Sequence, residues 1–220
     1  MTYSLCVREQ VAGADAPRFG VAAATRLPAV GSVCPHVSEQ GAVATAGVTD
    51  ADLGLRSLAD LAAGRRIDDV VATRAADAPT LQIHGVDAHA TAAHTGADCR
   101  PVATHASGDG YSVAGTSLAD DEVLAALAQG YRDNERDAPL VRRLITALAA
   151  AERAGGDRRT DLPVGSAAVV VTTPGSEPEP LYHDLRVDAN ESPVAELRET
   201  YRRAKHGYEA ALDRYQTENS

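Results

Sequence analysis

The sequence predicts an α+β layered sandwich built as a single domain over residues 1–220. Three observations carry this prediction: β-type alternation dominates the first half, helical spacing dominates the second half, and residues 167–172 return as a β-branched, central buried strand. Hydrophobic residues form 44% of the 220-residue chain, enough for a substantial core. No internal repeat and no low-complexity segment divides the chain.

The chain is expected to open with a β-hairpin. Residues 2–8 alternate between apolar and polar side chains, residues 12–17 form a turn cluster, and residues 19–25 return as the second strand. Further strands are expected over residues 30–34, 41–46, 81–86, 90–94, 111–114 and 181–187, with the segment 174–180 as a hairpin loop.

Helices are expected where apolar residues recur every three or four positions. Asp50 can cap the first helix, the segment 117–120 can cap the third, and Gly155 with Gly156 can end the fourth. The predicted helices run from Asp50 to Gly64, over residues 67–76, through Leu124, Leu127 and Tyr131, over residues 140–154, and over about 194–215 as a charged terminal helix.

The charge balance disfavours nucleic-acid partners. The chain has 21 Lys+Arg against 31 Asp+Glu, a net charge of -10, and no clustered basic run to meet a phosphate backbone. Lys205 is the only lysine, so the other 20 basic residues are arginines. An acidic, lysine-poor composition predicts a halophilic protein with an acidic surface. The alternative is an ordinary acidic protein from a GC-rich genome.

Other features predict a cytoplasmic protein without membrane contacts. No apolar stretch reaches the roughly 20 residues that span a bilayer, and the N-terminus lacks the build of a signal peptide. Cys6, Cys34 and Cys99 form no close pair, which indicates reduced thiols, and the first two are most simply small buried hydrophobic residues.

Thr2 is the first candidate catalytic residue. A small residue behind an initiator methionine permits removal of Met1, which would leave Thr2 as the mature N-terminus. The threonine hydroxyl needs a base, and a free α-amino group with a pKa of about 7.7–8.0 can serve as one. The start of a core strand would hold this residue rigidly. Threonine after methionine is also common in proteins without such a role.

Thr25 and Arg26 end the second strand of the hairpin. In an antiparallel pair this end lies beside the start of the first strand, so Arg26 is expected to approach Thr2. A fixed cation there would lower the pKa of the α-amine and stabilise an oxyanion. The alternative is a solvated arginine at a strand end.

No metal or cofactor is expected. The four histidines between residues 84 and 105 have no zinc-ligand spacing, and no carboxylate or cysteine completes one. The glycine-rich segment 107–110 matches no phosphate-binding fingerprint. These histidines are more simply strand-end or core-facing residues.

An ordered set of segments covers the chain from Thr2 to about Tyr201. They are residues 2–5, 20–26 with 29–31, 41–45, 92–96 with Cys99, 108–115, 155–159 with 166–168, 184–188 and 193–197. In this order they resemble a bacterial and archaeal family, domain of unknown function 1028, which itself resembles the N-terminal nucleophile (Ntn) hydrolases.

The resemblance implies a four-layer αββα sandwich, with Thr2 as nucleophile and its own amine as base. Thr25 and Arg26 fall where proteasome-like Ntn hydrolases place an acid–base pair, although the acid is absent here. Thr116 stands where relatives are expected to carry an asparagine, so a side-chain amide donor to the oxyanion is missing. The candidate pocket residues that match recurring family positions are His94, His105, Asp157 and Arg158.

Simpler interpretations of these pocket residues stay open. Asp157 and Arg158 can mark a helix end with a solvated ion pair, and His94 can be a structural histidine that hydrogen-bonds a neighbouring loop.

The leading hypothesis is therefore an Ntn-type amidohydrolase that cleaves a small amide or peptide-like substrate. Thr2 would attack the carbonyl, and Arg26 with backbone N–H groups would stabilise the oxyanion. The alternatives are a catalytically inactive module that binds a small ligand or protein partner and, more distantly, a metal-dependent hydrolase. A homo-oligomer is also expected. Its interface could use the terminal helix, which otherwise packs on its own domain, through Leu197, Tyr201, Tyr208, Leu212 and Tyr215.

Overall fold

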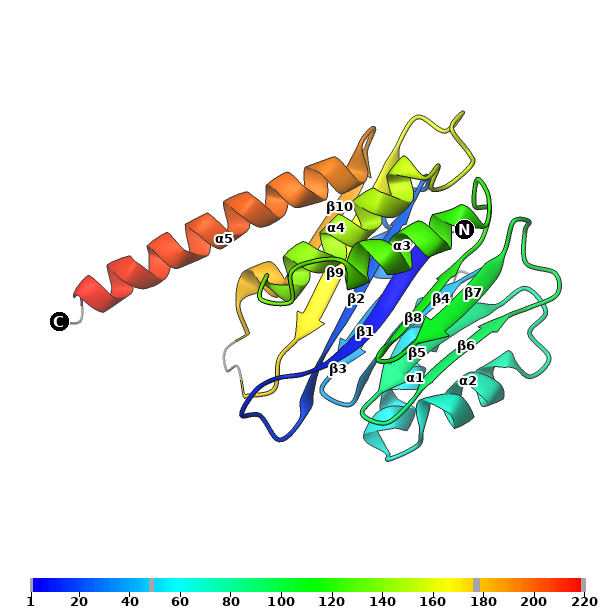
Figure 1. Ribbon diagram of the computed structural model, residues 1–220, viewed down its shortest axis with the longest axis horizontal. Coiled ribbons are helices and arrows are strands. Elements are labelled where there is room, and N and C mark those ends of the chain that lie inside the picture. The colour runs from blue at the N-terminus through cyan, green and yellow to red at the C-terminus, as the bar shows by residue number, and fades with distance from the viewer. Residues whose placement is uncertain (1, 48–49, 176–178, 219–220) are drawn as a thin grey trace.

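A computed structural model describes residues 2–47, 50–175 and 179–218 of the chain. Met1 and residues 176–178 of the expected hairpin loop lie outside the described residues. Within them the architecture is mixed α+β, with two antiparallel sheets and five α-helices (Figure 1). The predicted α+β class is confirmed.

The larger sheet has six strands in the order β10-β9-β2-β1-β8-β7, so β1 lies in its interior. The opening hairpin of the prediction is its centre, because β1 pairs antiparallel with β2. The strands are β1 (Tyr3–Gln10), β2 (Pro17–Thr25), β7 (Thr104–Gly108), β8 (Tyr111–Gly115), β9 (Gly165–Thr172) and β10 (Asp184–Asn190).

The smaller sheet has four strands in the order β3-β4-β5-β6, and it faces the larger one through contacts of β4 and β5 with β1. Its strands are β3 (Pro35–Ser38), β4 (Gly41–Ala46), β5 (Gln82–Asp87) and β6 (Thr91–Thr95). Small side chains fill most of the space between the sheets, among them Cys6, Ala23, Cys34, Ala42, Ala44 and Ala168. Two sheets with such side chains can pack closely without a cavity.

One buried histidine also joins the two sheets. His84 of β5 is 1% exposed, and its Nε2 and Nδ1 lie 2.8 Å from the Ser4 hydroxyl and 2.9 Å from the Ser112 hydroxyl. Burial, with a smaller contribution from His105, lowers the pKa of His84 to about 3. The ring is therefore neutral near neutral pH, and it gives two buried hydroxyls a hydrogen-bond partner in the space between the sheets.

Helices cover the outer face of each sheet (Figure 1). α1 (Ala51–Ala62) and α2 (Ile67–Ala75) pack on the smaller sheet. α3 (Glu122–Arg132) and α4 (Leu140–Arg153) pack on the larger one. Asp50 caps α1 as predicted, because its carboxylate accepts a hydrogen bond from the Asp52 N–H at 3.0 Å.

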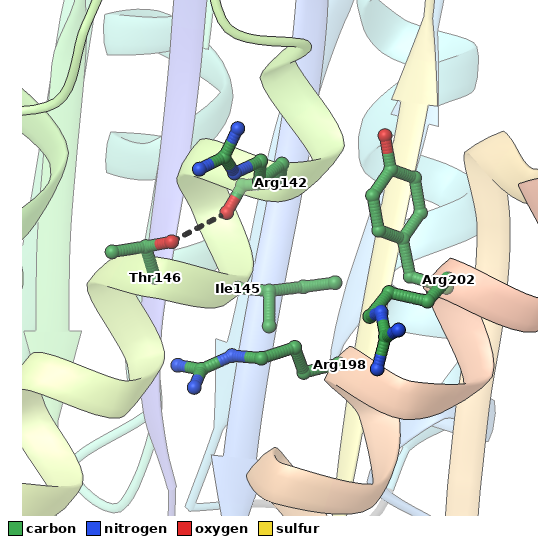
Figure 2. A pocket seen from close by; sticks show the side chains of 6 residues that line it. Arg142, Ile145, Thr146, Arg198 and Arg202 are labelled. Atoms are coloured by element: carbon green, nitrogen blue, oxygen red, sulfur yellow. Dashed lines mark hydrogen bonds between the residues drawn. The ribbon is translucent and has the colours of Figure 1, made fainter.

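α5 (Pro193–Glu218) begins beside α4, β9 and β10 and then extends away from the rest of the molecule (Figure 1). Arg198 and Arg202 of α5 border a groove beside Ile145 of α4 (Figure 2). Leu197 is fully buried on its own domain, whereas Tyr215 is 62% exposed. The distal half of α5 is thus more open to a partner than its first turns, and the homo-oligomer stays a prediction.

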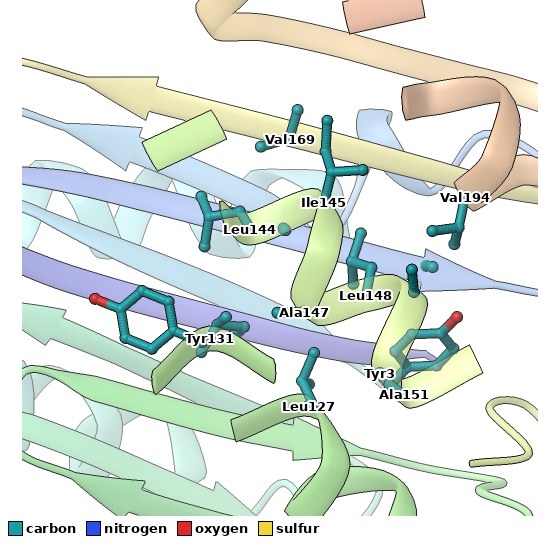
Figure 3. Packing of buried hydrophobic residues seen from close by; sticks show 14 of the residues in the cluster. Tyr3, Leu127, Tyr131, Leu144, Ile145, Ala147, Leu148, Ala151, Val169 and Val194 are labelled. Carbon is teal, nitrogen blue, oxygen red and sulfur yellow. The ribbon is translucent and has the colours of Figure 1, made fainter. Parts of the chain in front are cut away.

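Leucine, isoleucine and tyrosine build the core between the larger sheet and its helices (Figure 3). Leu144 and Leu148 lie one turn apart on α4, both fully buried, and the Tyr3 ring closes the end of this layer. Burying each such leucine contributes about 2 kcal/mol. This layer holds most of the large buried side chains, whereas the core between the two sheets has one, Phe19, among small residues.

Two local predictions were wrong. Residues 30–34 do not form a strand, since Ala29 adopts a left-handed backbone (φ 59°) and Val30–Ser32 form a 3₁₀ turn. Leu181–His183 form another 3₁₀ turn, so β10 begins later. Strands β3 and β7 were not predicted at all. Of the predicted capping segment 117–120, Asp120 lies at the start of α3, and its carboxylate accepts a hydrogen bond from the Glu122 N–H at 2.9 Å.

Candidate active site

A cavity of about 590 Å³ lies where β1 begins, and residues from both sheets line it. The larger sheet contributes Thr2 and Thr25, and the smaller sheet contributes Thr45. Asp98 and Arg100, from the segment between β6 and β7, add a carboxylate and a guanidinium to its lining. The cavity has the size of an ordinary small-molecule site.

The sheet register lines up three threonines in this cavity. Tyr3 pairs with the residue before Thr25 and with the residue before Thr116. Thr2 therefore lies between these two threonines at the end of the sheet, and all three line the cavity. The backbone N–H of Thr116 donates to the Thr2 carbonyl at 3.0 Å. Thr2 itself is only 6% exposed.

The Thr116 hydroxyl is buried without a partner. This residue is 1% exposed, and among the described residues nothing lies within hydrogen-bond reach of its Oγ1. An unsatisfied buried hydroxyl costs about 1–3 kcal/mol. Because Thr116 lines the cavity beside Thr2, a ligand atom in that cavity could accept this hydrogen bond.

A carboxylate lies beside Thr25, although the local sequence has none. The Thr25 hydroxyl donates to Oδ2 of Asp157 at 3.3 Å, and the backbone N–H of Arg26 donates to the same oxygen at 2.9 Å. Arg159 donates from Nε to Oδ1 of Asp157 at 2.9 Å, and from Nη2 to Oδ2 of Asp157 and to the Thr25 hydroxyl. The acid thus comes from the segment after α4.

The Asp157 network is buried and charged. Burial by itself would raise the pKa of the Asp157 carboxyl, but the hydrogen bonds from Arg159 and from the Arg26 N–H bring that pKa below its usual range. The ion-pair partner is Arg159, a residue that the sequence did not single out. Arg158, a predicted pocket residue, is exposed, and its N–H donates to the Ser117 carbonyl at 3.0 Å.

Arg26 and Thr2 do not come together. Arg26 lines a separate pocket of about 210 Å³ that also contacts Tyr3 and Glu152. Its guanidinium donates to the carbonyls of Leu162 at 3.0 Å and Glu191 at 3.1 Å. The reason is strand parity: Thr25 and Arg26 are neighbours, so their side chains leave opposite faces of the sheet.

The two candidate histidines also lie apart from Thr2. His94 is on β6 and His105 on β7, and neither lines the threonine cavity. Burial, and then the neighbouring His94, lower the pKa of His105. Its Nδ1 lies 2.9 Å from the Thr95 hydroxyl.

Two thiols line the threonine cavity as well. Burial raises the pKa of Cys34 to about 11 and also raises the pKa of Cys99. Both are therefore mainly protonated near neutral pH, which makes them poor nucleophiles. Within the described part of the chain, no group of three or more His, Cys, Asp and Glu side chains could hold a metal ion. Over the same residues, no helix combines the length and apolarity needed to cross a membrane.

The groove between α4 and α5 is a weaker candidate for chemistry (Figure 2). It measures about 600 Å³, and Arg142, Arg198 and Arg202 border it. Two hydroxyl-bearing residues line it, Thr146 and Tyr201. The Thr146 hydroxyl already donates to the Arg142 carbonyl at 2.8 Å. No base faces that hydroxyl among the lining residues.

Comparisons with known proteins place the chain in a family. The model of a family of unknown function, DUF1028, matches residues 2–197. The crystal structure of protein SPO2555 from Silicibacter pomeroyi, assigned to the same family, is similar with a TM-score of 0.78 and 25% sequence identity. The match covers 92% of this chain and 88% of that one. No curated protein matches the chain.

Proposed function

The chain belongs to the DUF1028 family, whose function is unknown, and on that premise we propose that it is an amidohydrolase of the N-terminal nucleophile type. One observation carries the proposal: Thr2 lines a ligand-sized cavity beside the unpartnered hydroxyl of Thr116. The substrate would be a small amide or peptide-like molecule. The order of layers supports the idea, since two facing antiparallel sheets lie between pairs of helices as in an αββα sandwich.

The proposed reaction begins with removal of Met1, which frees the α-amine of Thr2. That amine takes the proton of the Thr2 hydroxyl while Oγ1 bonds to the substrate carbonyl carbon. The tetrahedral intermediate collapses, the C–N bond breaks, and the leaving amine takes the proton from the α-ammonium group. Water then attacks the resulting ester, which releases the acid and restores Thr2.

Thr116 takes the role of oxyanion donor in this proposal. Its hydroxyl is buried, unpartnered and beside Thr2, so it can donate to the developing oxyanion without losing another hydrogen bond. Arg26 no longer serves in that role, because its guanidinium is hydrogen-bonded to the backbone carbonyls of Leu162 and Glu191.

Asp157 and Arg159 act as positioning residues. Together they hold the Thr25 hydroxyl, which neighbours Thr2 in the sheet.

Two measurements test the proposal. Intact-mass spectrometry of the purified protein should give the mass of the chain without Met1, since retention of Met1 would leave no free α-amine on Thr2. A panel of small amides, assayed by amine release, should include compounds that the wild type cleaves and the Thr2→Ala variant does not. Thr2→Ser serves as the matched control and should keep activity.

A non-catalytic module that binds a small ligand is the second candidate function. The low exposure of Thr2, at 6%, favours it, because a nucleophile must be reachable. In that case the Thr2→Ala variant and the wild type would bind the same compounds, and neither would release an amine.

A further inference from the structure

A second cavity, of about 670 Å³, lies at the opposite end of β1 from Thr2. Thr2 and Glu9 are seven positions apart in an extended chain, a distance of about 24 Å. The cavity is therefore separate from the one that Thr2, Thr25 and Thr116 line. Five arginines from different parts of the fold line it: Arg8 of β1, Arg18 of β2, Arg132 of α3, Arg136 of the following loop and Arg143 of α4.

The charge of this cavity is opposite to that of the protein. Five arginines face two carboxylates, Glu9 and Asp109, which leaves a net charge of +3 in a chain of net charge -10. A concave site of one sign concentrates the field and attracts ligands of the opposite sign. The positive charge of this cavity in an acidic protein therefore favours the binding of an anion.

Glu9 fixes the positions of three side chains that line the cavity. It pairs with Arg143 at 2.6 Å and with Arg18 at 2.7 Å, and it accepts a hydrogen bond from the Tyr131 hydroxyl at 2.7 Å. The guanidinium carbon of Arg143 lies 4.9 Å above the centre of the Tyr131 ring. Such fixed guanidinium groups lose little freedom when a ligand binds.

Donors remain after these contacts are made. Arg143 is 2% exposed, yet its Nε has no partner among the described residues. Arg132 and Arg136 are exposed, and over the same part of the chain neither takes part in an ion pair. Arg8 donates from Nη1 to the Asp87 carbonyl at 3.1 Å, and its ion pair with the fully exposed Asp109 is long, at 3.8 Å.

We infer that this cavity binds a phosphorylated small molecule, whose phosphate oxygens accept hydrogen bonds from Arg132, Arg136 and Arg143. A guanidinium group can bind two oxygens of a carboxylate or of a phosphate. A phosphate has more acceptor oxygens than a carboxylate, so it can bind several converging arginines at once. The volume accommodates more than one phosphate group or a phosphate with an organic part. The inference does not depend on the proposed amidohydrolase activity.

The test is calorimetric titration of the full chain with inorganic pyrophosphate, at the lowest KCl concentration at which circular dichroism shows a folded protein. The wild type should bind one pyrophosphate saturably. The double variant Arg132→Gln/Arg136→Gln should bind it about tenfold or more weakly, because two charge-assisted hydrogen bonds are lost. Both residues are exposed, so this variant should fold, whereas Arg143 is too buried for a clean substitution.

The matched control is Arg56→Gln/Arg66→Gln, which removes the same charge from the α1–α2 side of the protein. These arginines are about half exposed and pair with Asp50 and Asp68. The control should bind pyrophosphate within about twofold of the wild type. An equal loss in both double variants, no saturable binding to the wild type, or citrate binding as tightly as pyrophosphate would each overturn the phosphate assignment.

Discussion

The Thr25 hydroxyl donates a hydrogen bond to the Asp157 carboxylate across 132 positions of sequence, and Arg159 contacts both groups. This contact ties the segment after α4 to the end of β2, directly beside Thr2. The stability of that end of the sheet should therefore depend on the charge of Asp157.

The substitution Asp157→Asn should lower the free energy of unfolding by about 3 kcal/mol, because it leaves the part-buried Arg159 guanidinium without its counter-charge. Urea denaturation measures this loss. The control is Asp188→Asn, which removes an exposed ion pair with Arg186 and should cost less than about 1 kcal/mol. Equal losses in the two variants would contradict the buried network.

His84 should make stability depend on pH. Its pKa is about 3 in the folded chain, against about 6.5 when unfolded, so between these values the unfolded chain binds the extra proton. Stability should therefore fall as the pH falls below about 6, by up to about 1.4 kcal/mol per pH unit from this group.

The variant His84→Gln should lose that contribution to the pH dependence, although it should be less stable than the wild type at pH 7. Urea titrations at several pH values compare the two proteins. A slope in His84→Gln equal to that of the wild type would show that the His84 ring is not held neutral.

Two helical glycines should respond in opposite directions to alanine. A Cβ on Gly54 of α1 would lie 1.9 Å from the ring of the buried His36, so Gly54→Ala should lower stability by about 2 kcal/mol. A Cβ on Gly207 of α5 would meet nothing within 4 Å, so Gly207→Ala should raise stability by about 0.5–1 kcal/mol. Thermal melts would contradict the packing of α1 on β3 if Gly54→Ala melted no earlier than the wild type.

Thr116→Ala should reduce kcat about a hundredfold for any amide that the wild type cleaves, because one oxyanion donor is lost. Thr116→Ser keeps the hydroxyl and should stay within about tenfold of the wild type. The alanine variant should melt no earlier than the wild type, since the hydroxyl has no partner among the described residues. Unchanged kcat in Thr116→Ala would remove Thr116 from the proposed mechanism.

Much of the fold could be predicted because most strands and helices have the apolar periodicity that is typical of the element they form. β4 matches its predicted range, and α2 and α4 differ from theirs by one residue at the C-terminal end. β7 escaped because it is a largely exposed edge strand, Thr104–Gly108, without apolar alternation. The turn at Ala29 depends on a left-handed backbone that alanine rarely adopts, which no local pattern signals.

The site could be predicted only in part. Thr2 and Thr25 follow from the hairpin register, which a turn and two alternating strands indicate. Arg26 was expected to approach Thr2, but successive side chains along a strand point to opposite faces of the sheet. Since Thr25 lies beside Thr2, Arg26 points away from it. Arg159 and Arg100 reach the site through loops, and their positions depend on tertiary contacts that periodicity does not encode.

Covalent trapping of Thr2 tests whether its hydroxyl is the nucleophile. The intact protein is treated with a β-lactone, whose ring opens to acylate a hydroxyl nucleophile, and its N-terminal peptide is then fragmented in a mass spectrometer. A single acyl group is expected on the Thr2 hydroxyl, with none in Thr2→Ala and slower labelling in Thr116→Ala. A label on Cys34, Cys99 or Ser4 with Thr2 unmodified would show that Thr2 is not the nucleophile.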